Sequence, residues 1–330
     1  MRRAKISAVG CYVPPRLLTN QDLEKMVETS SQWILDRTGI AERHIVEPGQ
    51  ATSDMAYEAA KVALERRGID PAGLDAIIVC TVTPDMFFPS TACLVQHRLG
   101  APNAWGFDLI AACSGFVYGL TTAAHLVGAG THQRVMVIGA DTMSRIIDYT
   151  DRATCVLFGD GAGAMIVEPA GEGEDAGFID FSNQIDGSGA PFLNMPAGGS
   201  RIPPSHETID KKMHFVHQEG QQVFKYAVRK MYEACRDLLA KHGLTGDDIA
   251  LFVPHQANIR IITAVSDRLG LSPDKVMINI QRYGNTTAAT IPLAAEDAIL
   301  QGKLKRGDLV LIAAVGAGFT FGANLWRWAY

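Results

Sequence analysis

The sequence predicts an α/β protein made of two similar halves, in which buried parallel strands lie between layers of helices. The first observation is that apolar runs such as residues 134–141 and 307–318 alternate with segments of helical period. This alternation is typical of parallel sheets that are covered on both faces. The second observation is that the first half of the chain recurs in the second half. The composition is that of an ordinary globular protein, since 47% of the 330 residues are hydrophobic and 20% are charged.

The repeat begins with two segments that carry the same signals in the same order. "GIDPAGLDAIIVCTVTPD" (68–85) and "GLTGDDIALFVPHQAN" (243–258) each start with a glycine that ends a helix and pass through a turn into an apolar strand. The segments that precede them, 53–67 and 218–242, have apolar residues three and four apart, as amphipathic helices do.

The repeat continues through the centre of each half. "RLGAPNAWGFDLIAACSG" (98–115) is matched by "RLGLSPDKVMINIQRYGNTTA" (268–288), where Arg-Leu-Gly leads to a short strand and then to a polar break that opens a helix. The helices that follow, 114–129 and 286–301, carry almost only small and apolar residues. We therefore expect both helices to be sandwiched between the two sheets.

The domain organisation follows from the repeat. We expect two halves, residues 1–175 and 176–330, that face each other about a pseudo-twofold axis in one compact body, because no polar linker separates them. The most irregular segment, 183–217, contains clustered turn-forming residues. The sequence leaves open whether this segment lies at the mouth of a site or is only a long surface loop.

Composition disfavours several classes of function. The formal net charge of −5 provides no general basic face for nucleic acid. The six cysteines form no CxxC pair and the nine histidines no HExxH motif, so we expect neither a disulfide framework nor a metal site. No secretory signal pattern follows the basic first residues, and segment 108–134 is too interrupted to span a membrane. We therefore expect a cytoplasmic protein.

Three polar residues are predicted to converge at one edge of the sheets. When the two copies are laid over each other, Cys113 and Asn285 fall at the same turn between a strand and a central helix. His255 follows strand 249–254, at the equivalent of Val82. The carboxyl ends of parallel strands are where α/β sheets gather their ligand sites.

The chemistry of these residue types indicates acyl transfer. A helix N-terminus favours the thiolate form of Cys113, and cysteine with histidine supports transfer through a thioester. His255 and Asn285 are able to donate two hydrogen bonds to one carbonyl oxygen and so stabilise an enolate. Each residue alone has a structural explanation, as a small core residue, a core histidine or a helix cap. Their joint arrival at one edge favours a site for forming carbon-carbon bonds from thioesters.

Seven motifs of the chain resemble those of a known family, β-ketoacyl-acyl carrier protein synthase III of the thiolase superfamily. The resemblance rests on "WILDRTGI" (33–40), "FPSTA" (88–92), "AACSGF" (111–116), "TDRATCVLFGDGAGA" (150–164), "PHQAN" (254–258), "GNTTAA" (284–289) and "GAGFTFG" (316–322). It implies the thiolase fold, in which duplicated βαβαβαββ halves form a five-layered αβαβα sandwich.

The resemblance also implies a reaction, the initiating condensation of fatty-acid synthesis. Cys113 would take the acyl group from a short acyl-CoA, with the peptide N–H groups of Cys113, Ala317 and Gly318 as the oxyanion hole. Malonyl-acyl carrier protein would then lose carbon dioxide, and its enolate, held by His255 and Asn285, would attack the acyl-cysteine. The products are β-ketoacyl-acyl carrier protein, CoA and carbon dioxide. No metal or organic cofactor is implied.

Binding residues are implied in the same way. Trp33 and Arg152 would sandwich the CoA adenine, and the other residues implied at the CoA site are Arg37, Thr38, Phe224 and Asn258. The basic residues expected to meet the acidic carrier protein are Lys225, Arg229 and Arg260, with Lys211 and Lys212 as weaker choices. Phe88 would reach across a homodimer and close the acyl pocket of the partner.

Two alternatives to this function stay open. One is a synthase III-like enzyme of secondary metabolism that loads unusual starters or transfers acyl groups without condensation. The other is a catalytically silent thiolase-fold subunit that only shapes a heterodimer. The second predicts the loss of Cys113, His255 or Asn285, and all three are present.

Overall fold

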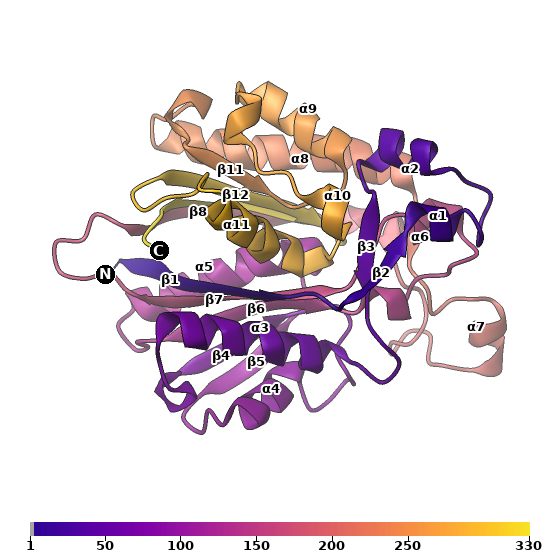
Figure 1. Ribbon diagram of the computed structural model, residues 1–330, viewed down its shortest axis with the longest axis horizontal. Helices are drawn as coiled ribbons and strands as arrows, with labels where there is room; N and C mark the ends of the chain where they lie inside the picture. Colours follow the sequence, from indigo (N-terminus) through magenta and orange to yellow (C-terminus); the bar gives the residue numbers. More distant parts are fainter. Residues whose placement is uncertain (1–2) are drawn as a thin grey trace.

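Two mixed β-sheets form the framework of the computed structural model, which describes residues 3–330 (Figure 1). The first sheet has five strands in the order β1 (Ala4–Tyr12), β7 (Gly161–Pro169), β6 (Val135–Asp141), β4 (Ala76–Cys80) and β5 (Trp105–Leu109). The second has four strands in the order β11 (Leu251–Pro254), β12 (Leu309–Gly316), β13 (Thr320–Arg327) and β8 (Gly177–Ile185).

Only part of each sheet is parallel. Strands β6, β4 and β5 run parallel, as do β11 and β12, whereas β1, β7, β13 and β8 pair antiparallel. The expectation of parallel sheets is therefore correct for only part of each sheet. The reason is local for β12 and β13, because residues 317–319 form a turn too short for the crossover that a parallel pair requires.

Helices cover and separate the sheets in five layers (Figure 1). The outer face of the first sheet is covered by α3 (Thr52–Arg67) and α4 (Thr91–Leu99), and that of the second by α8 (Gly220–Lys241) and α9 (Ile259–Leu269). The central layer consists of α5 (Gly115–Gly128) and α11 (Thr290–Leu300). The predicted αβαβα sandwich is thus confirmed.

The central helices are buried because their residues are small or apolar. Phe116 and Leu120 of α5 and Ile291 of α11 belong to one core cluster with strand residues of both sheets. Gly119 allows the close approach, since a Cβ atom there would lie 2.7 Å from the sulfur of Cys80. The chain passes from the first sheet to the second between β7 and β8, and the boundary at residue 175 stays a prediction.

The two central helices begin with the same backbone turn. A 3-10 turn, η2 (Ala112–Ser114) or η7 (Thr287–Ala289), precedes each helix and opens with a residue at positive φ, +46° at Ala112 and +53° at Thr287. This correspondence places Cys113 opposite Ala288 rather than Asn285. Counted from the starts of β4 and β11, His255 likewise lies opposite Cys80 rather than Val82.

An inserted helix explains the error of register at Asn285. The short strand predicted around residues 276–280 makes only one bridge, between Val276 and Phe252, and the chain then turns into α10 (Ile280–Tyr283). The first half has no helix at the corresponding place, between β5 and η2. An alignment that matches the polar breaks of the two copies therefore places Cys113 opposite Asn285, although the backbone turns place it opposite Ala288.

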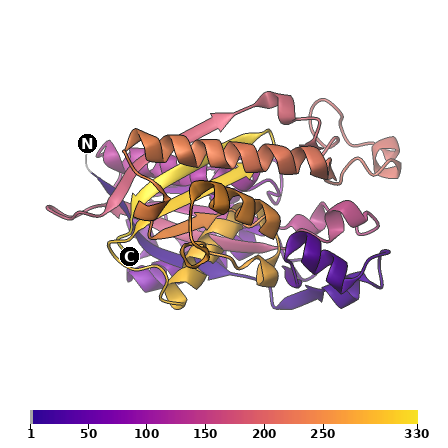
Figure 2. The ribbon, with the colours of Figure 1, turned by 90° about the horizontal axis from the view of Figure 1, so that it is seen from above.

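Smaller elements gather at one end of the sandwich, and both termini lie toward the other end (Figures 1 and 2). Near the first end lie β2 (Arg16–Thr19), α1 (Asn20–Leu23), α2 (Ser31–Thr38), β3 (Glu42–Ile45), α6 (Arg152–Cys155), β9 (Leu193–Asn194), α7 (His206–Asp210) and β10 (His217–Gln218). The remaining short 3-10 turns are η1 (Pro71–Gly73), η3 (Met143–Arg145), η4 (Gly187–Gly189), η5 (Gly246–Asp248) and η6 (Pro273–Lys275).

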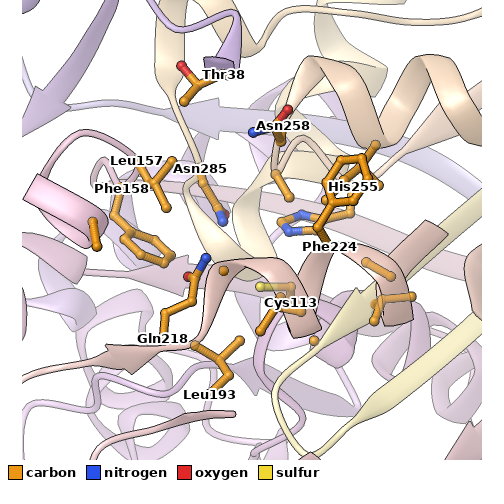
Figure 3. Close-up of a pocket in the computed structure, with 18 of the residues that line it drawn as sticks. Thr38, Cys113, Leu157, Phe158, Leu193, Gln218, Phe224, His255, Asn258 and Asn285 are labelled. Atoms are coloured by element: carbon orange, nitrogen blue, oxygen red, sulfur yellow. The ribbon is translucent and has the colours of Figure 1, made fainter. Parts of the chain in front are cut away.

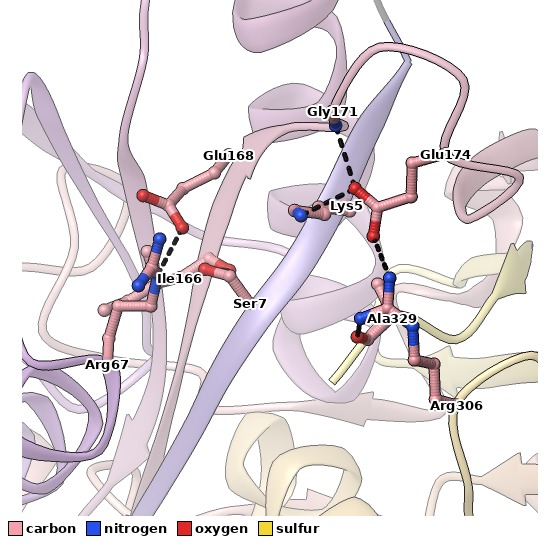
Figure 4. Close-up of polar contacts among 9 residues, drawn as sticks. All are labelled: Lys5, Ser7, Arg67, Ile166, Glu168, Gly171, Glu174, Arg306 and Ala329. Atoms are coloured by element: carbon pink, nitrogen blue, oxygen red, sulfur yellow. Dashed lines mark hydrogen bonds and ion pairs between the residues drawn. The ribbon is translucent and has the colours of Figure 1, made fainter.

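A polar latch at the end near the termini joins parts of both sheets (Figure 4). The carboxylate of Glu174, in the connection between β7 and β8, accepts hydrogen bonds from Lys5 Nζ at 2.7 Å and from Arg306 Nη2 at 2.7 Å. Arg306 also donates to the carbonyl of Ala329 at 3.0 Å. The hydrogen bond from Lys5 and the nearby cations hold the pKa of Glu174 below its usual value.

No helix within residues 3–330 is long and apolar enough to cross a membrane. The same residues contain no group of three or more His, Cys, Asp or Glu side chains arranged to hold a metal ion. The cytoplasmic location stays a prediction.

Candidate active site

Cys113, His255 and Asn285 line one cavity of about 210 Å³ (Figure 3). They come from η2, from the end of β11 and from the segment between α10 and η7. Leu193 and Gln218, from the irregular segment and its border, line the same cavity. This segment therefore lies at the site rather than serving only as a surface loop.

The segment that carries Cys113 is held against the turn between β12 and β13. Ser114 Oγ donates to the carbonyl of Thr320 at 3.0 Å, and Thr320 Oγ1 donates to the carbonyl of Ala111 at 2.8 Å. Gly316 lies directly behind the backbone of Cys113, since a Cβ atom on Gly316 would be 2.7 Å from the peptide nitrogen of Cys113. Only glycine fits at this position without displacing the backbone of the nucleophile.

The surroundings of the Cys113 side chain favour the protonated thiol. Burial raises its pKa to about 12, and the nearby Asp141 carboxylate adds to that effect. Its own peptide N–H lowers the pKa but does not compensate. The expectation that the helix N-terminus favours a thiolate here is therefore wrong, because loss of water disfavours the charged form more strongly.

Asp141 is a buried carboxylate that the sequence analysis missed. At the end of β6 it accepts hydrogen bonds from the hydroxyls of Thr81 and Thr83, both at 3.0 Å, and from the peptide N–H of Val82 at 2.8 Å. Its second oxygen accepts from the peptide N–H of Ala288 at 3.4 Å. It thus ties the loop after β4 to η7. Burial raises its pKa to about 6 although these hydrogen bonds oppose the shift.

His255 is neutral and presents one nitrogen to the cavity. Burial lowers its pKa to about 3, and only 1% of the residue is exposed. Its Nδ1 lies 2.7 Å from Oγ1 of Thr290. Among the described residues its buried Nε2 has no hydrogen-bond partner. This atom is therefore available to a substrate.

Asn285 is oriented by its own backbone neighbourhood. Its Oδ1 accepts a hydrogen bond from the peptide N–H of Thr287 at 2.9 Å, which leaves the Nδ2 amide as the group that is able to donate. The main chain is fixed as well, because Asn285 N donates to Leu157 O at 2.9 Å and Gly159 N donates to Asn285 O at 3.1 Å. The side chain is thus held as a hydrogen-bond donor.

The peptide groups predicted to form an oxyanion hole belong to η2 and to the turn between β12 and β13. Ala317, in the turn between β12 and β13, lines a second cavity together with Cys113. Gly316 lines the first cavity, whereas Gly318 is not among the residues that line either one. Cys113 and Ala317 therefore border one cavity, and the role of their peptide groups as an oxyanion hole stays a prediction.

The second cavity encloses about 150 Å³ and is apolar. It meets Cys113, and its other lining residues include Val82, Met143, Ile146, Phe158, Leu193 and Met195. This chamber was not predicted, because its wall is assembled from eight separate segments of the chain. Residues of this kind suit an alkyl chain attached to the sulfur.

The residues expected to bind CoA lie at the entrance, and the polar groups of Thr38 and Asn258 are already hydrogen-bonded within the protein. Trp33, Arg37, Thr38, Phe224 and Asn258 line the first cavity. The Thr38 hydroxyl donates within α2, and the amide of Asn258 caps α9 while donating to the carbonyl of Arg37.

Arg152 does not leave a slot beside Trp33. Its guanidinium carbon lies 4.9 Å from the centre of the Trp33 ring, so the two groups stack on each other. The same side chain donates to the carbonyl of Glu28 at 2.9 Å. A purine enters between the two groups only after Arg152 moves.

The basic residues expected to meet a carrier protein lie near this entrance. Lys225, Arg229 and Arg260 are exposed on α8 and at the start of α9. Lys225 and Arg229 border a hollow whose other lining residues are Phe192, Gln222, Tyr226 and Phe319.

The weaker basic choices are engaged in ion pairs. Lys211 pairs with Glu207 at 2.5 Å, and Lys212 with Asp148 at 2.8 Å.

Phe88, the residue expected to reach across a homodimer, is 85% exposed and lies beside Phe87, which is 80% exposed. Phe87 lines a surface cavity that shares Val82, Ile146 and Met195 with the apolar chamber.

Comparison with known proteins decides the family. The family model described as 3-oxoacyl-[acyl-carrier-protein (ACP)] synthase III matches residues 107–187, and the model of its C-terminal part matches residues 239–328. The β-ketoacyl-[acyl-carrier-protein] synthase III of Solibacter usitatus is 70% identical over the full length of both chains. That of Koribacter versatilis is 60% identical over all of this chain and 99% of its own.

The chain belongs to the β-ketoacyl-[acyl-carrier-protein] synthase III family. The predicted resemblance is thereby confirmed. Among solved structures, 3-oxoacyl-[acyl-carrier-protein] synthase III from Aquifex aeolicus is 44% identical with a TM-score of 0.91, covering 98% of this chain and 100% of its own. The priming β-ketosynthase of the R1128 polyketide pathway is 34% identical with a TM-score of 0.91, covering 99% and 97%.

Proposed function

We propose that this chain catalyses the initiating condensation of fatty-acid synthesis through an acyl-Cys113 thioester. A short acyl-CoA and malonyl-acyl carrier protein give β-ketoacyl-acyl carrier protein, CoA and carbon dioxide, so the enzyme is an acyltransferase. The supporting observation is that Cys113, His255 and Asn285 line one cavity in a chain 70% identical to a synthase of this name.

Loading transfers the acyl group to sulfur. Cys113 Sγ forms a bond with the acyl carbon, the bond from that carbon to the CoA sulfur breaks, and the thiol proton passes to the departing sulfur. CoA then leaves as a thiol. The peptide N–H groups of Cys113 and Ala317 stabilise the negative oxygen of the intermediate.

Condensation uses the other two side chains. The malonyl carboxylate leaves as carbon dioxide, and its bonding electrons form an enolate whose oxygen accepts hydrogen bonds from Asn285 Nδ2 and His255 Nε2. The enolate carbon attacks the acyl carbon, the bond to Cys113 Sγ breaks, and the sulfur takes a proton from solvent. A neutral histidine suits this step, since it donates without titrating.

The acyl group occupies the apolar chamber. A volume of about 150 Å³ with hydrophobic walls favours a short alkyl chain over a charged one. CoA and the pantetheine arm of the carrier protein use the first cavity, where Trp33, Phe224 and Asn258 lie.

The carrier protein docks on the basic residues of the entrance. Lys225, Arg229 and Arg260 complement an acidic partner, and the hollow beside them accepts an apolar side chain over Phe192 and Phe319.

We also propose a homodimer. Strand β5 is an edge strand of its sheet, and Ile110, directly after it, is 74% exposed. Pairing of two such edges would cover this face, and Phe88 would reach the acyl chamber of the partner.

The test separates the two half-reactions. The protein is incubated with radiolabelled acetyl-CoA, or with longer and branched acyl-CoAs, and malonyl-acyl carrier protein is then added. We expect label on Cys113 that moves into a β-ketoacyl product. Label that is retained and never transferred would reject condensation, and a Cys113→Ser variant that loads at the parent rate would reject the nucleophile.

One alternative has specific support, namely priming of a polyketide pathway, because the R1128 priming ketosynthase is 34% identical over nearly the whole chain. The same assay with carrier proteins of both kinds decides between them. Preference for a fatty-acid carrier protein supports the main proposal.

A further inference from the structure

Thr290 connects the histidine of the site to the first turn of α11. Its Oγ1 lies 2.7 Å from His255 Nδ1 and 3.0 Å from the carbonyl oxygen of Thr287. The residue is 2% exposed, so water does not compete for the hydroxyl. Thr290 lines neither of the cavities that meet Cys113, so its contact with the site is through His255.

The hydroxyl carries one hydrogen and has two acceptors within reach. The carbonyl of Thr287 already accepts the peptide N–H of Thr290 and is satisfied without the hydroxyl. Nδ1 of His255 has Thr290 as its partner and forms the shorter contact. Donation to Nδ1 therefore leaves no buried acceptor without a hydrogen bond.

The direction of this hydrogen bond decides whether His255 Nε2 presents a hydrogen or a lone pair to the cavity. A neutral imidazole carries one hydrogen, on Nδ1 or on Nε2. When Thr290 donates to Nδ1, that hydrogen lies on Nε2 and is offered to the cavity. When Thr290 donates to Thr287 instead, Nδ1 carries the hydrogen and Nε2 faces the cavity as a lone pair, which repels a carbonyl oxygen.

We propose that Thr290 is a positioning residue for condensation, whose hydroxyl donates to Nδ1 of His255 and so holds the ring hydrogen on Nε2. The ring then donates to the thioester oxygen of the malonyl group together with Asn285 Nδ2. The inference rests on the proposed function for its substrate, but the state of the ring is a property of the free protein. Loading of Cys113 does not depend on it.

The first experiment compares the half-reactions of a Thr290→Val variant with those of the parent. Valine keeps the shape of the side chain and removes the hydroxyl. We expect decarboxylation of malonyl-acyl carrier protein to fall about 10- to 100-fold, by analogy with removing the hydrogen-bond partner that orients a metal-bound histidine. Acylation of Cys113 by acyl-CoA should change little.

Two further variants serve as controls. Thr290→Ser retains the hydroxyl and should restore most of the decarboxylation. Thr286→Val removes another buried hydroxyl of the same segment, one without a hydrogen-bond partner among the described residues, and should leave both half-reactions near the parent rates. Equal loss of loading and decarboxylation in Thr290→Val, or no rescue by serine, would assign the residue a merely structural role.

The second experiment measures the ring directly. In protein labelled with ¹⁵N-histidine, the nitrogen shifts and couplings of His255, assigned by their loss in His255→Gln, should identify hydrogen on Nε2. Hydrogen on Nδ1 in the parent protein would overturn the proposal. Absence of condensation with any carrier protein would instead refute the proposed function, and the spectrum would still decide the role of Thr290.

Discussion

The two halves of the molecule begin their central helices with the same backbone and different chemistry. Ala112 and Thr287 open equivalent turns at positive φ, yet the next residue is Cys113 in one half and Ala288 in the other. The second half instead contributes Asn285 from before its turn. The turn is thus a shared structural element of the duplicated fold, and the reactive groups are additions to it.

The strands that precede these turns differ in the same way. Cys80 in the first half and His255 in the second occupy equivalent places. Cys80 is fully buried beneath Gly119, where burial raises its pKa well above the usual value. His255 has a nitrogen free toward the cavity. The comparison teaches that position in the repeat does not by itself make a residue functional, because access to the cavity decides.

The largest effect is expected from making the two turns alike. A Cys113→Ala variant places alanine at both equivalent positions and removes the nucleophile, so acylation by acyl-CoA should fall by on the order of 10³-fold or more. Decarboxylation of malonyl-acyl carrier protein should persist, because His255 and Asn285 are unchanged. Radiolabel bound to the protein measures acylation, and release of carbon dioxide measures decarboxylation. Loss of both would contradict a division between the halves.

The converse change acts on the second half. Asn285→Ala removes one hydrogen-bond donor to the enolate and should lower decarboxylation about 10²- to 10³-fold. Loading of Cys113 should remain close to that of the parent. Asn285→Asp, which keeps the size but presents no amide donor, should behave like alanine, and an active aspartate variant would argue against donation.

A third change tests the contact between the halves at the nucleophile. Gly316→Ala introduces a Cβ atom 2.7 Å from Cys113 N and should slow loading while costing about 1–3 kcal/mol of stability, the usual range for overpacking. Gly187→Ala is the matched control, because a Cβ there meets no atom within 4 Å. For each variant, thermal unfolding measures the change in stability and the acylation rate measures the change in loading. Normal loading by the Gly316 variant would show that the backbone yields.

The smallest effect is expected at the latch far from the site. Glu174→Gln should lower the free energy of unfolding at pH 7 by about 1 kcal/mol and leave activity unchanged. Because the pKa of Glu174 is lowered in the folded protein, its contribution is present above the unfolded value near 4.5 and is lost as pH falls through the folded value.

Denaturant unfolding at several pH values therefore should show parent and Glu174→Gln variant converging in acid. A difference that is constant down to pH 3 would mean that the ion pairs do not account for it. Arg3→Gln, which removes a more exposed pair with Asp175, is a control that should have less effect.

Much of the fold was predictable because it depends on patterns along the chain. Apolar runs, helix-ending glycines and the repeat were sufficient for two halves and for buried central helices, and the family resemblance supplied the five layers. The prediction of parallel strands was correct for only part of each sheet, since a buried apolar run looks the same in parallel and antiparallel pairs. The strand around residues 276–280 failed because α10 begins where pairing would continue.

The residues alone predicted which residue types meet at the strand ends, and the family resemblance supplied the residues at the entrance. The protonation of Cys113 depends on how much water its surroundings remove, which the sequence does not state. Asp141 and Thr290 act through contacts between segments far apart in the chain, so nothing near them signals a role. The apolar chamber escaped prediction for the same reason, as Leu193 and Met195 lie in the irregular segment.

Cys113 lies at the narrow junction between the entrance cavity and the apolar chamber, since it lines both. In the proposed reaction, acyl-CoA and malonyl-acyl carrier protein each bring a long pantetheine arm to this junction through the entrance cavity. The first arm has to withdraw before the second is admitted, so initial rates should obey ping-pong kinetics, with parallel double-reciprocal lines and free CoA competing against the carrier protein.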